Sequence, residues 1–274
     1  MTSAAAHALP EFLPQHLANT SWAFAVLMVP SDESVWAGLA TASIETMPVH
    51  GNARDVANTA WAFAACRYHD LGLMEAISAA AQKQQLEFGA RDLSQTAWSF
   101  AALAIRDVPL MQGLCAVALT GLREESESGN GSNAFTVQDA ANMLWSVAVL
   151  MVPHPDMVSD VAKFSVRHAE EIRPQHLANL VWAVAILQFR DAVLLETLEA
   201  TATAGMPDFD VQSVTNTVWG FAVCSIASQR LLTAVAEQSV RLSHAFTLQD
   251  LTSCVWAFAV LKMRGHSCDK DKKK

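Results

Sequence analysis

The 274-residue sequence is poor in charge, in turn-forming residues and in long apolar runs. Charged residues make up 16% of it and apolar residues 52%, a balance that excludes a disordered polyelectrolyte. The longest apolar runs, Trp22 to Pro30 and Val147 to Pro153, fall far short of the roughly 18 to 20 residues that a membrane span needs. With only 9 prolines and 11 glycines, the composition favours helices over a turn-rich β architecture.

Targeting and cysteine patterns are also missing. The first twenty residues show neither a secretory signal pattern nor the arginines of an organelle transit peptide, so we expect a soluble protein without a membrane segment. The five cysteines contain no CxxC pair, and three of them occupy apolar repeat positions, which favours reduced thiols over disulfides or zinc ligands. The formal net charge of −9 weighs against a nucleic-acid partner.

No pattern in the sequence supports catalysis. The nine histidines form no HExxH or HxH spacing, and there is no glycine-rich phosphate loop and no GxSxG motif. We therefore predict a protein that is not an enzyme, with no cofactor, no metal and no small-molecule substrate.

A tryptophan-centred segment recurs along nearly the whole chain. Its tryptophans are Trp22, Trp61, Trp98, Trp145, Trp182, Trp219 and Trp256. They are spaced by 39, 37, 47, 37, 37 and 37 residues, and the longest spacing contains the extra Gly/Ser/acidic stretch 123–133. Such a period is typical of tandem two-element repeats. We predict that the stretch 123–133 is a flexible loop insertion.

A second apolar segment follows each of the first six tryptophans at a fixed offset. Its anchors lie 16 residues after the tryptophan, or 17 in the first repeat: Leu39, Ile77, Leu114, Val161, Leu198 and Val235. Two registers locked to each other predict two helices per repeat. Nine residues before each tryptophan stand predicted N-cap positions, four of which are Asn, Asp or Thr. Asp55, Asp92, Asp139 and Asp250 lie where a capping-box acid belongs. We expect the first helix to run about 17 residues from this cap.

The sequence thus predicts an all-α fold, an α-solenoid (superhelix) of tandem two-helix repeats of about 37 residues. Residues 1–12 would be an N-terminal extension and 265–274 a charged C-terminal tail. The array would span 13–264, with six hairpins and a seventh first helix. Because that last helix would leave apolar surface uncovered, we expect either a truncated chain or a protein partner at the C-terminal end.

The repeated tryptophans allow two interpretations. Their neighbours are Ala, Val, Phe and Leu at helical spacing, which favours a place in the core between repeats. The alternative is a ladder of indoles on which a ligand stacks, as in single-strand nucleic-acid binders.

A polar stripe precedes each tryptophan. One position lies three residues before it and the other seven before it, so both share one helix face, and a small residue that follows the tryptophan is expected to form an open floor beside them. The stripe comprises Gln15 and Asn19, Arg54 and Asn58, Arg91 and Gln95, Gln138 and Asn142, Gln175 and Asn179, Gln212 and Asn216, and Gln249 and Ser253. Amide groups suit the reading of base edges, and the alternative is a ladder of hydrogen bonds between repeats. We favour the ladder for the position three residues before the tryptophan and ligand contact for the position seven before it.

Basic residues follow the first helix in several repeats. Arg67, Arg106, Arg190, Lys262 and Arg264 lie six or eight residues after their tryptophans. They would either complement helix C-termini or form a basic rim along a phosphate backbone. In the stripe and its capping positions, two arginines against four aspartates argue against a phosphate clamp.

The segments PQHLANTSWAFA (14–25) and PQHLANLVWAVA (174–185) resemble octotricopeptide-type helical repeats and the related repeats of FAST-kinase-like and RAP-domain proteins. The resemblance covers about residues 13 to 263, and no RAP domain follows the last repeat. It implies sequence-selective binding of single-stranded RNA, with a role in organellar RNA processing, stability or translation. It also implies a mitochondrial matrix location, with the chloroplast as the alternative.

Our first hypothesis is therefore a non-catalytic RNA-binding solenoid whose first helices line the concave face. The stripe from Gln15 and Asn19 to Gln249 and Ser253 would contact about one nucleotide per repeat. The alternative is a protein–protein interaction scaffold that holds an extended peptide or helix on the same surface, which the acidic net charge favours.

Overall fold

The computed structural model describes residues 11–28, 33–128, 134–152, 154–226 and 228–271, with side chains described outside 125–128 and 263–271. Within these ranges the chain forms α-helices and single-turn 3-10 helices and no strand, which confirms the all-α fold of stacked helical repeats. The chain divides into two compact units, residues 1–154 and residues 155–274. The division falls inside the fourth repeat, between its first and its second helix.

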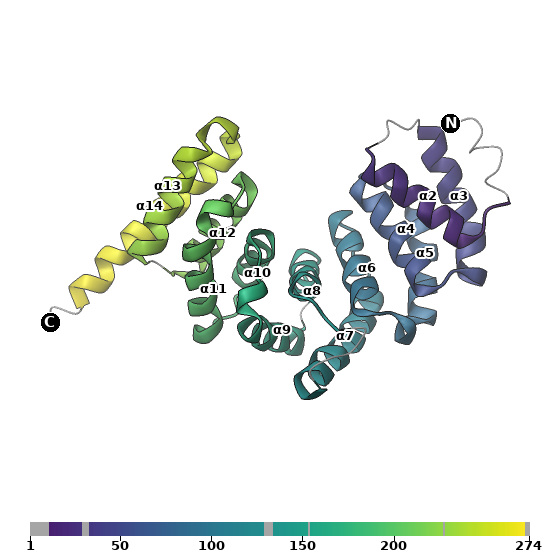
Figure 1. Ribbon diagram of the computed structural model, residues 1–274, viewed down its shortest axis with the longest axis horizontal. Helices are drawn as coiled ribbons and strands as arrows, with labels where there is room; N and C mark the ends of the chain where they lie inside the picture. Colours follow the sequence, from purple (N-terminus) through teal and green to yellow (C-terminus); the bar gives the residue numbers. More distant parts are fainter. Residues whose placement is uncertain (1–10, 29–32, 129–133, 153, 227, 272–274) are drawn as a thin grey trace. The chain divides into compact units, whose positions relative to one another are not determined.

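The first unit stacks successive repeats so that first helices pack on first helices (Figure 1). Its first helices are α2 (Pro14–Val26), α4 (Ala53–Ala65), α6 (Ala90–Ala102) and α8 (Val137–Val149). Its second helices are α3 (Glu33–His50), α5 (Leu71–Lys83) and α7 (Val108–Ser128), and the 3-10 helix η2 (Gln85–Glu87) precedes α6.

The second unit repeats the arrangement, with α10 against α12 and α12 against α14. Its first helices are α10 (Pro174–Ile186), α12 (Val211–Cys224) and α14 (Leu248–Asp271), and its second helices are α9 (Pro155–Arg167), α11 (Ala192–Gly205) and α13 (Gln229–Arg241). The 3-10 helices η3 (Ala169–Glu171), η4 (Met206–Asp208) and η5 (Ser243–Ala245) lead into α10, α12 and α14.

Each first helix begins directly after its predicted N-cap, which confirms the predicted helix starts. In α4, the Asn52 side chain accepts from the Asp55 amide at 3.0 Å while Asp55 accepts from the Asn52 amide at 3.2 Å. This reciprocal capping box satisfies two amides that the helix itself leaves unpaired. Asp92, Asp139 and Asp250 accept the N-cap amide in the same way. In α2 and α10 the Nδ1 atom of a histidine, His16 or His176, takes the place of the carboxylate.

Six of the seven first helices end sooner than predicted, after 13 or 14 residues instead of about 17, whereas α14 runs for 24 residues, through Asp271 of the predicted C-terminal tail. Six residues after each of the first six tryptophans the backbone turns left-handed, with φ between 47° and 63°, at Met28, Arg67, Ala104, Met151, Gln188 and Ser225. At the last five of these turns the next residue donates to a carbonyl five positions back, as Tyr68 does to Phe63 at 3.0 Å, which is a Schellman C-cap. Glycine usually marks such a turn, and its absence here hid the helix ends from sequence analysis.

The core lies between the two layers of helices. The six second-helix anchors, from Leu39 to Val235, are all buried, as the fixed offset predicted. On the first helices α4 to α12, the residue two positions after the tryptophan is fully buried: Phe63, Phe100, Val147, Val184 and Phe221. Trp36, which stands outside the repeated positions, is also buried, with its ring 5.0 Å from that of Phe63.

The stretch 123–133 departs from its prediction in part. Residues 123–128 are not a loop, because α7 continues without a break through Ser128. Glu, Arg and Ser are tolerated well enough in helices for the helix to extend past its buried part. Residues 129–133 lie outside the described residues, as do 1–10 and 272–274 of the predicted extension and tail.

The last first helix, α14, exposes apolar side chains at the end where a protein partner was expected. Leu248 and Val255 of α14 are 84% and 67% exposed. Val218 of α12, which stands at the same repeat position as Val255, is buried. The partner predicted for this end stays a prediction. No helix within the described ranges is long and apolar enough to cross a membrane.

Candidate binding face of the first helices

The repeated tryptophans do not lie in the core, so their favoured interpretation was wrong. Trp22 and Trp256 are 41% and 45% exposed, and the other five are partly exposed. The physical reason is helix geometry: a residue two positions further on lies about 200° around the helix, so burying the phenylalanine there turns the tryptophan outward. The periodicity predicted that both positions are apolar, but it could not show which of the two residues is the more buried.

The small residue after each tryptophan is the one that packs between repeats. Ala62, Ser99, Ser146, Ala183 and Ala257 are fully buried, so they form no open floor for a ligand. At Gly220 the approach is closest, since a Cβ there would lie 2.5 Å from Cγ1 of Val181 and 3.0 Å from its carbonyl oxygen. Close helix packing, rather than access for a ligand, requires these small residues.

The tryptophans share their helix face with the polar stripe. Seven, three and zero residues before the tryptophan are positions one helical turn apart, so they lie in line along the helix. We call the residues at these three positions the amide–tryptophan face of each helix. It comprises Gln15, Asn19 and Trp22 in α2; Arg54, Asn58 and Trp61 in α4; Arg91, Gln95 and Trp98 in α6; Gln138, Asn142 and Trp145 in α8; Gln175, Asn179 and Trp182 in α10; Gln212, Asn216 and Trp219 in α12; and Gln249, Ser253 and Trp256 in α14.

The outer position of this face is open to solvent in every repeat. All seven Gln or Arg residues are exposed, whereas the position three before the tryptophan is partly exposed in every repeat except the first, where Asn19 is exposed. The amide Nε2 of Gln95 donates to Oδ1 of Asn58 and to the carbonyl of Ala57, each at 3.3 Å. The inner amides therefore take part in packing between repeats at this junction, where the outer residues Arg54 and Arg91 are exposed.

In the second unit the indoles also stack on one another. The ring centroids of Trp182 and Trp219 lie 6.5 Å apart, and those of Trp219 and Trp256 lie 6.4 Å apart, with the planes inclined by 31° and 29°. Aromatic pairs at this separation attract each other by about 0.5–1.5 kcal/mol beyond simple burial. The result is an ordered row of partly exposed aromatic rings beside the amides of α10, α12 and α14.

The face carries no carboxylate, although the chain has 27 acidic residues. The aspartates next to the outer position are held in the capping boxes, and Asp55 and Asp139 are only 5% and 7% exposed. Burial raises the pKa of the Asp55 carboxyl, while the Asn52 amide and the charge of Arg54 act in the opposite direction. The negative net charge of the whole chain is therefore not the charge of this face.

Two of the basic residues after the first helices cap the neighbouring repeat. Nε of Arg106 donates to the carbonyl of Leu150 at 3.0 Å, at the C-terminus of α8. Arg190 donates in the same way to the carbonyl of Val223 at 3.3 Å, in α12. These arginines complement helix C-termini, as one of the two interpretations had it. Arg67 and Lys262 are exposed, and the side chain of Arg264 lies outside the described ones.

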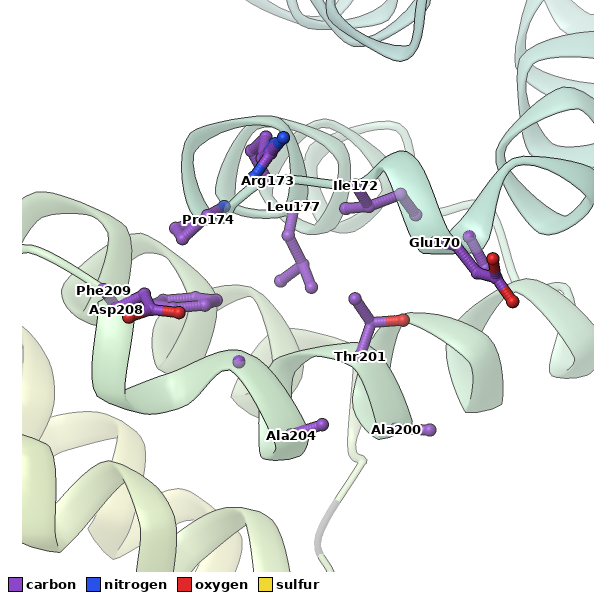
Figure 2. A pocket seen from close by; sticks show the side chains of 12 residues that line it. Glu170, Ile172, Arg173, Pro174, Leu177, Ala200, Thr201, Ala204, Asp208 and Phe209 are labelled. Carbon is purple, nitrogen blue, oxygen red and sulfur yellow. The ribbon is translucent and has the colours of Figure 1, made fainter.

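A separate hollow of about 520 Å³ opens in the second unit between the start of α10 and α11 (Figure 2). Leu177 and Phe209 point into it, Glu170 and Arg173 lie at its edge, and none of the fourteen stripe residues lines it. Thr201 of α11 borders the space. In the next repeat the equivalent residue is the buried Gln238, whose Nε2 donates to the carbonyls of Pro207 and Phe209 at 3.2 and 2.8 Å. The hollow is thus the space that a longer side chain fills one repeat later.

No group of three or more His, Cys, Asp or Glu side chains gathers to hold a metal ion in the part of the chain that the structure describes.

Comparison with known proteins assigns the family. The family described as RNA-editing substrate-binding complex 6 protein matches residues 126–267, slightly more than half of the chain. The chain belongs to this family. The match to RNA-editing substrate-binding complex 6 proteins covers α8 to α13 and most of α14, and with them the amide–tryptophan faces of four first helices. It does not confirm the octotricopeptide or FAST-kinase-like resemblance, which stays a prediction. No curated protein matches the chain.

Proposed function

We propose that this protein is a non-catalytic RNA-binding repeat protein whose amide–tryptophan faces contact single-stranded RNA. The observation that carries the proposal is the position of the tryptophans, which lie partly exposed beside a row of amides on a face without carboxylates. The family name, which joins RNA editing to a substrate-binding complex, supports RNA as the partner.

The two residue types of the face have complementary roles in this proposal. An indole offers a flat surface to any base, and stacking on an aromatic side chain contributes about 1–3 kcal/mol per base. A glutamine or asparagine offers one donor pair and one acceptor to the edge of a base, which is how proteins distinguish bases. Because the outer residues Gln175, Gln212 and Gln249 are exposed, they meet the strand first.

The spacing of the indoles limits how the strand can lie. Neighbouring rings are 6.4–6.5 Å apart in the second unit, about twice the 3.4 Å rise of a stacked strand. A base sandwiched between two parallel rings needs the full double distance of about 6.8 Å, and these planes are inclined by 31° and 29°, so the rings must move slightly apart before a base can enter. The proposal therefore places the bases against the exposed edges of the ladder, with the strand stretched to about one nucleotide per repeat.

An extended peptide is the second candidate, because the same spacing equals about two residues of extended chain at 3.3–3.6 Å each. The net charge of −9 would favour a basic peptide.

The test is a titration of the whole protein against a labelled random RNA 12-mer and a labelled lysine-rich peptide, by fluorescence anisotropy at two salt concentrations. The proposal expects RNA binding at low micromolar protein that weakens as salt rises. Peptide binding without RNA binding would refute it and favour the scaffold.

A matched pair of variants then tests the face itself. Gln175→Ala with Asn179→Ala should change the base preference of bound RNA while the urea midpoint of unfolding stays near that of the wild type. Gln229→Ala removes an exposed amide from the second helix α13 and should change neither. If the Gln175 and Asn179 variant lowers the midpoint strongly and leaves base preference unchanged, these amides hold the repeats together and do not read RNA.

A role in organellar RNA processing, stability or translation, and a mitochondrial or chloroplast location, belong to the proposal only through the repeat resemblance. Fractionation of cells that express a tagged copy tests the location.

A further inference from the structure

We propose that Arg54 and Arg91 bind phosphate groups of the RNA strand and so anchor it on the first unit, whereas the other five repeats contact it with uncharged amides. This inference rests on the proposed function and adds to it which two repeats bind the phosphate groups of the strand. It concerns two neighbouring helices, α4 and α6, which pack directly on each other.

Both arginines stand where the helix itself disfavours a cation. Each is the second residue of its helix, at the end that carries the positive part of the helix dipole. A cation there loses about 0.3–1 kcal/mol, and a glutamine occupies the same position in the other five repeats. A local cost at an exposed position is expected where the residue serves a ligand.

The neighbouring aspartates do not explain the arginines. Asp55 and Asp92 are engaged with the N-cap amides of Asn52 and Gly89. Asp139 makes the same capping box in α8, beside Gln138 and not beside an arginine. A carboxylate at this position therefore does not need a neighbouring guanidinium, and the two guanidinium groups stay exposed on the face.

The chemistry of the position suits a phosphate. A guanidinium presents several N–H donors in one plane, which matches two phosphate oxygens at once. The first amides of the helix have no partner inside it and point toward the same end. At α6, where Gly89 has no side chain to cap them, the amide of Asp92 has no side-chain partner. Helix ends of this kind attract anions.

The experiment measures the salt dependence of RNA binding for the whole protein. Arg54→Gln with Arg91→Gln restores the residue that the other repeats carry, so the fold should be unaffected. The control, Lys83→Gln with Arg123→Gln, removes two exposed cations from the second helices of the same unit. Both double variants change the net charge equally and are measured against the same random RNA 12-mer between 0.05 and about 1 M salt.

Each phosphate contact contributes about 0.7 to the slope of log K against log salt for a single strand, so losing two should lower the slope by about 1.4. That change corresponds to binding about 25-fold weaker near 0.1 M salt, and little changed near 1 M. The control variant should keep the wild-type slope.

An unchanged slope in the Arg54 and Arg91 variant, with wild-type RNA binding intact, would overturn the inference and leave the proposed function standing. Equal losses in both variants would also overturn it, because the effect would then be one of net charge. If the wild type itself shows no salt-sensitive RNA binding, the proposed function fails, and the inference with it.

Discussion

Replacing Gln238 by threonine should open in the sixth repeat the hollow that Thr201 leaves in the fifth. Both residues lie nineteen positions after their tryptophan, so they face equivalent surroundings. Gln238 is only 4% exposed and its Nε2 donates to two backbone carbonyls, at 3.2 and 2.8 Å. Its Oε1 accepts from Arg241 at 3.5 Å. Threonine is too short to reach either carbonyl.

The magnitude follows from these contacts. Two hydrogen bonds contribute about 1 kcal/mol each, and a carbonyl left dry and unpaired would cost about 1–3 kcal/mol. Because the equivalent hollow beside Thr201 is open to solvent, water can reach the freed carbonyls. We therefore expect Gln238→Thr to lower the free energy of unfolding by about 2 kcal/mol. The converse change, Thr201→Gln, should fill the hollow and raise it by about 1 kcal/mol.

Urea unfolding followed by circular dichroism measures both changes, with an unchanged m-value as the sign that only stability has moved. Gln229→Thr makes the same chemical change at an exposed position of α13 and should stay within about 0.5 kcal/mol of the wild type. A Gln238→Thr protein as stable as this control, or a Thr201→Gln protein less stable than the wild type, would refute the reasoning from repeat equivalence.

Three further predictions concern packing, helix ends and thiols. Gly220→Ala should cost about 1–3 kcal/mol in urea unfolding, because its Cβ would meet Val181, and adding Val181→Ala should restore part of the loss. Ala104→Gly should raise the thermal midpoint, since alanine at φ 55° costs about 1–2 kcal/mol that glycine largely avoids; a lower midpoint would contradict the Schellman assignment. Burial raises the pKa of the Cys115 thiol from 9.0 to about 12, so above pH 9 the thiol stays protonated in the folded protein and ionises in the unfolded chain. The free energy of unfolding should therefore fall as the pH rises above 9. The fall should be smaller in Cys115→Ala, and iodoacetamide at pH 8 should label the exposed Cys66 well before Cys115 in the folded protein.

Much of the repeat architecture could be predicted because it depends on local signals. The tryptophan spacing and the 16-residue offset fixed the two-helix unit, and the N-cap residues placed the start of every first helix at the correct position. Capping needs only side chains within three residues of one another, as between Asn52 and Asp55, so sequence shows it directly. The ends of these helices depend on left-handed residues such as Ala104 and Arg67, which carry no local mark.

Local patterns along the chain were thus enough to predict the fold class, the period, the helix starts and the polar outer row from Gln15 to Gln249. The burial of Phe63, Phe100 and Phe221 in place of their tryptophans depends on tertiary packing. Trp98 and Phe100 are both apolar on one helix, and the packing of neighbouring helices puts the phenylalanine inside and the tryptophan on the face. The same packing buries Asp55 and leaves Arg54 exposed, so two residues that are adjacent in the sequence differ in their access to solvent. Burial depends on which residues are neighbours in space, and in this fold those neighbours belong to adjacent repeats, about 37 residues away in the sequence.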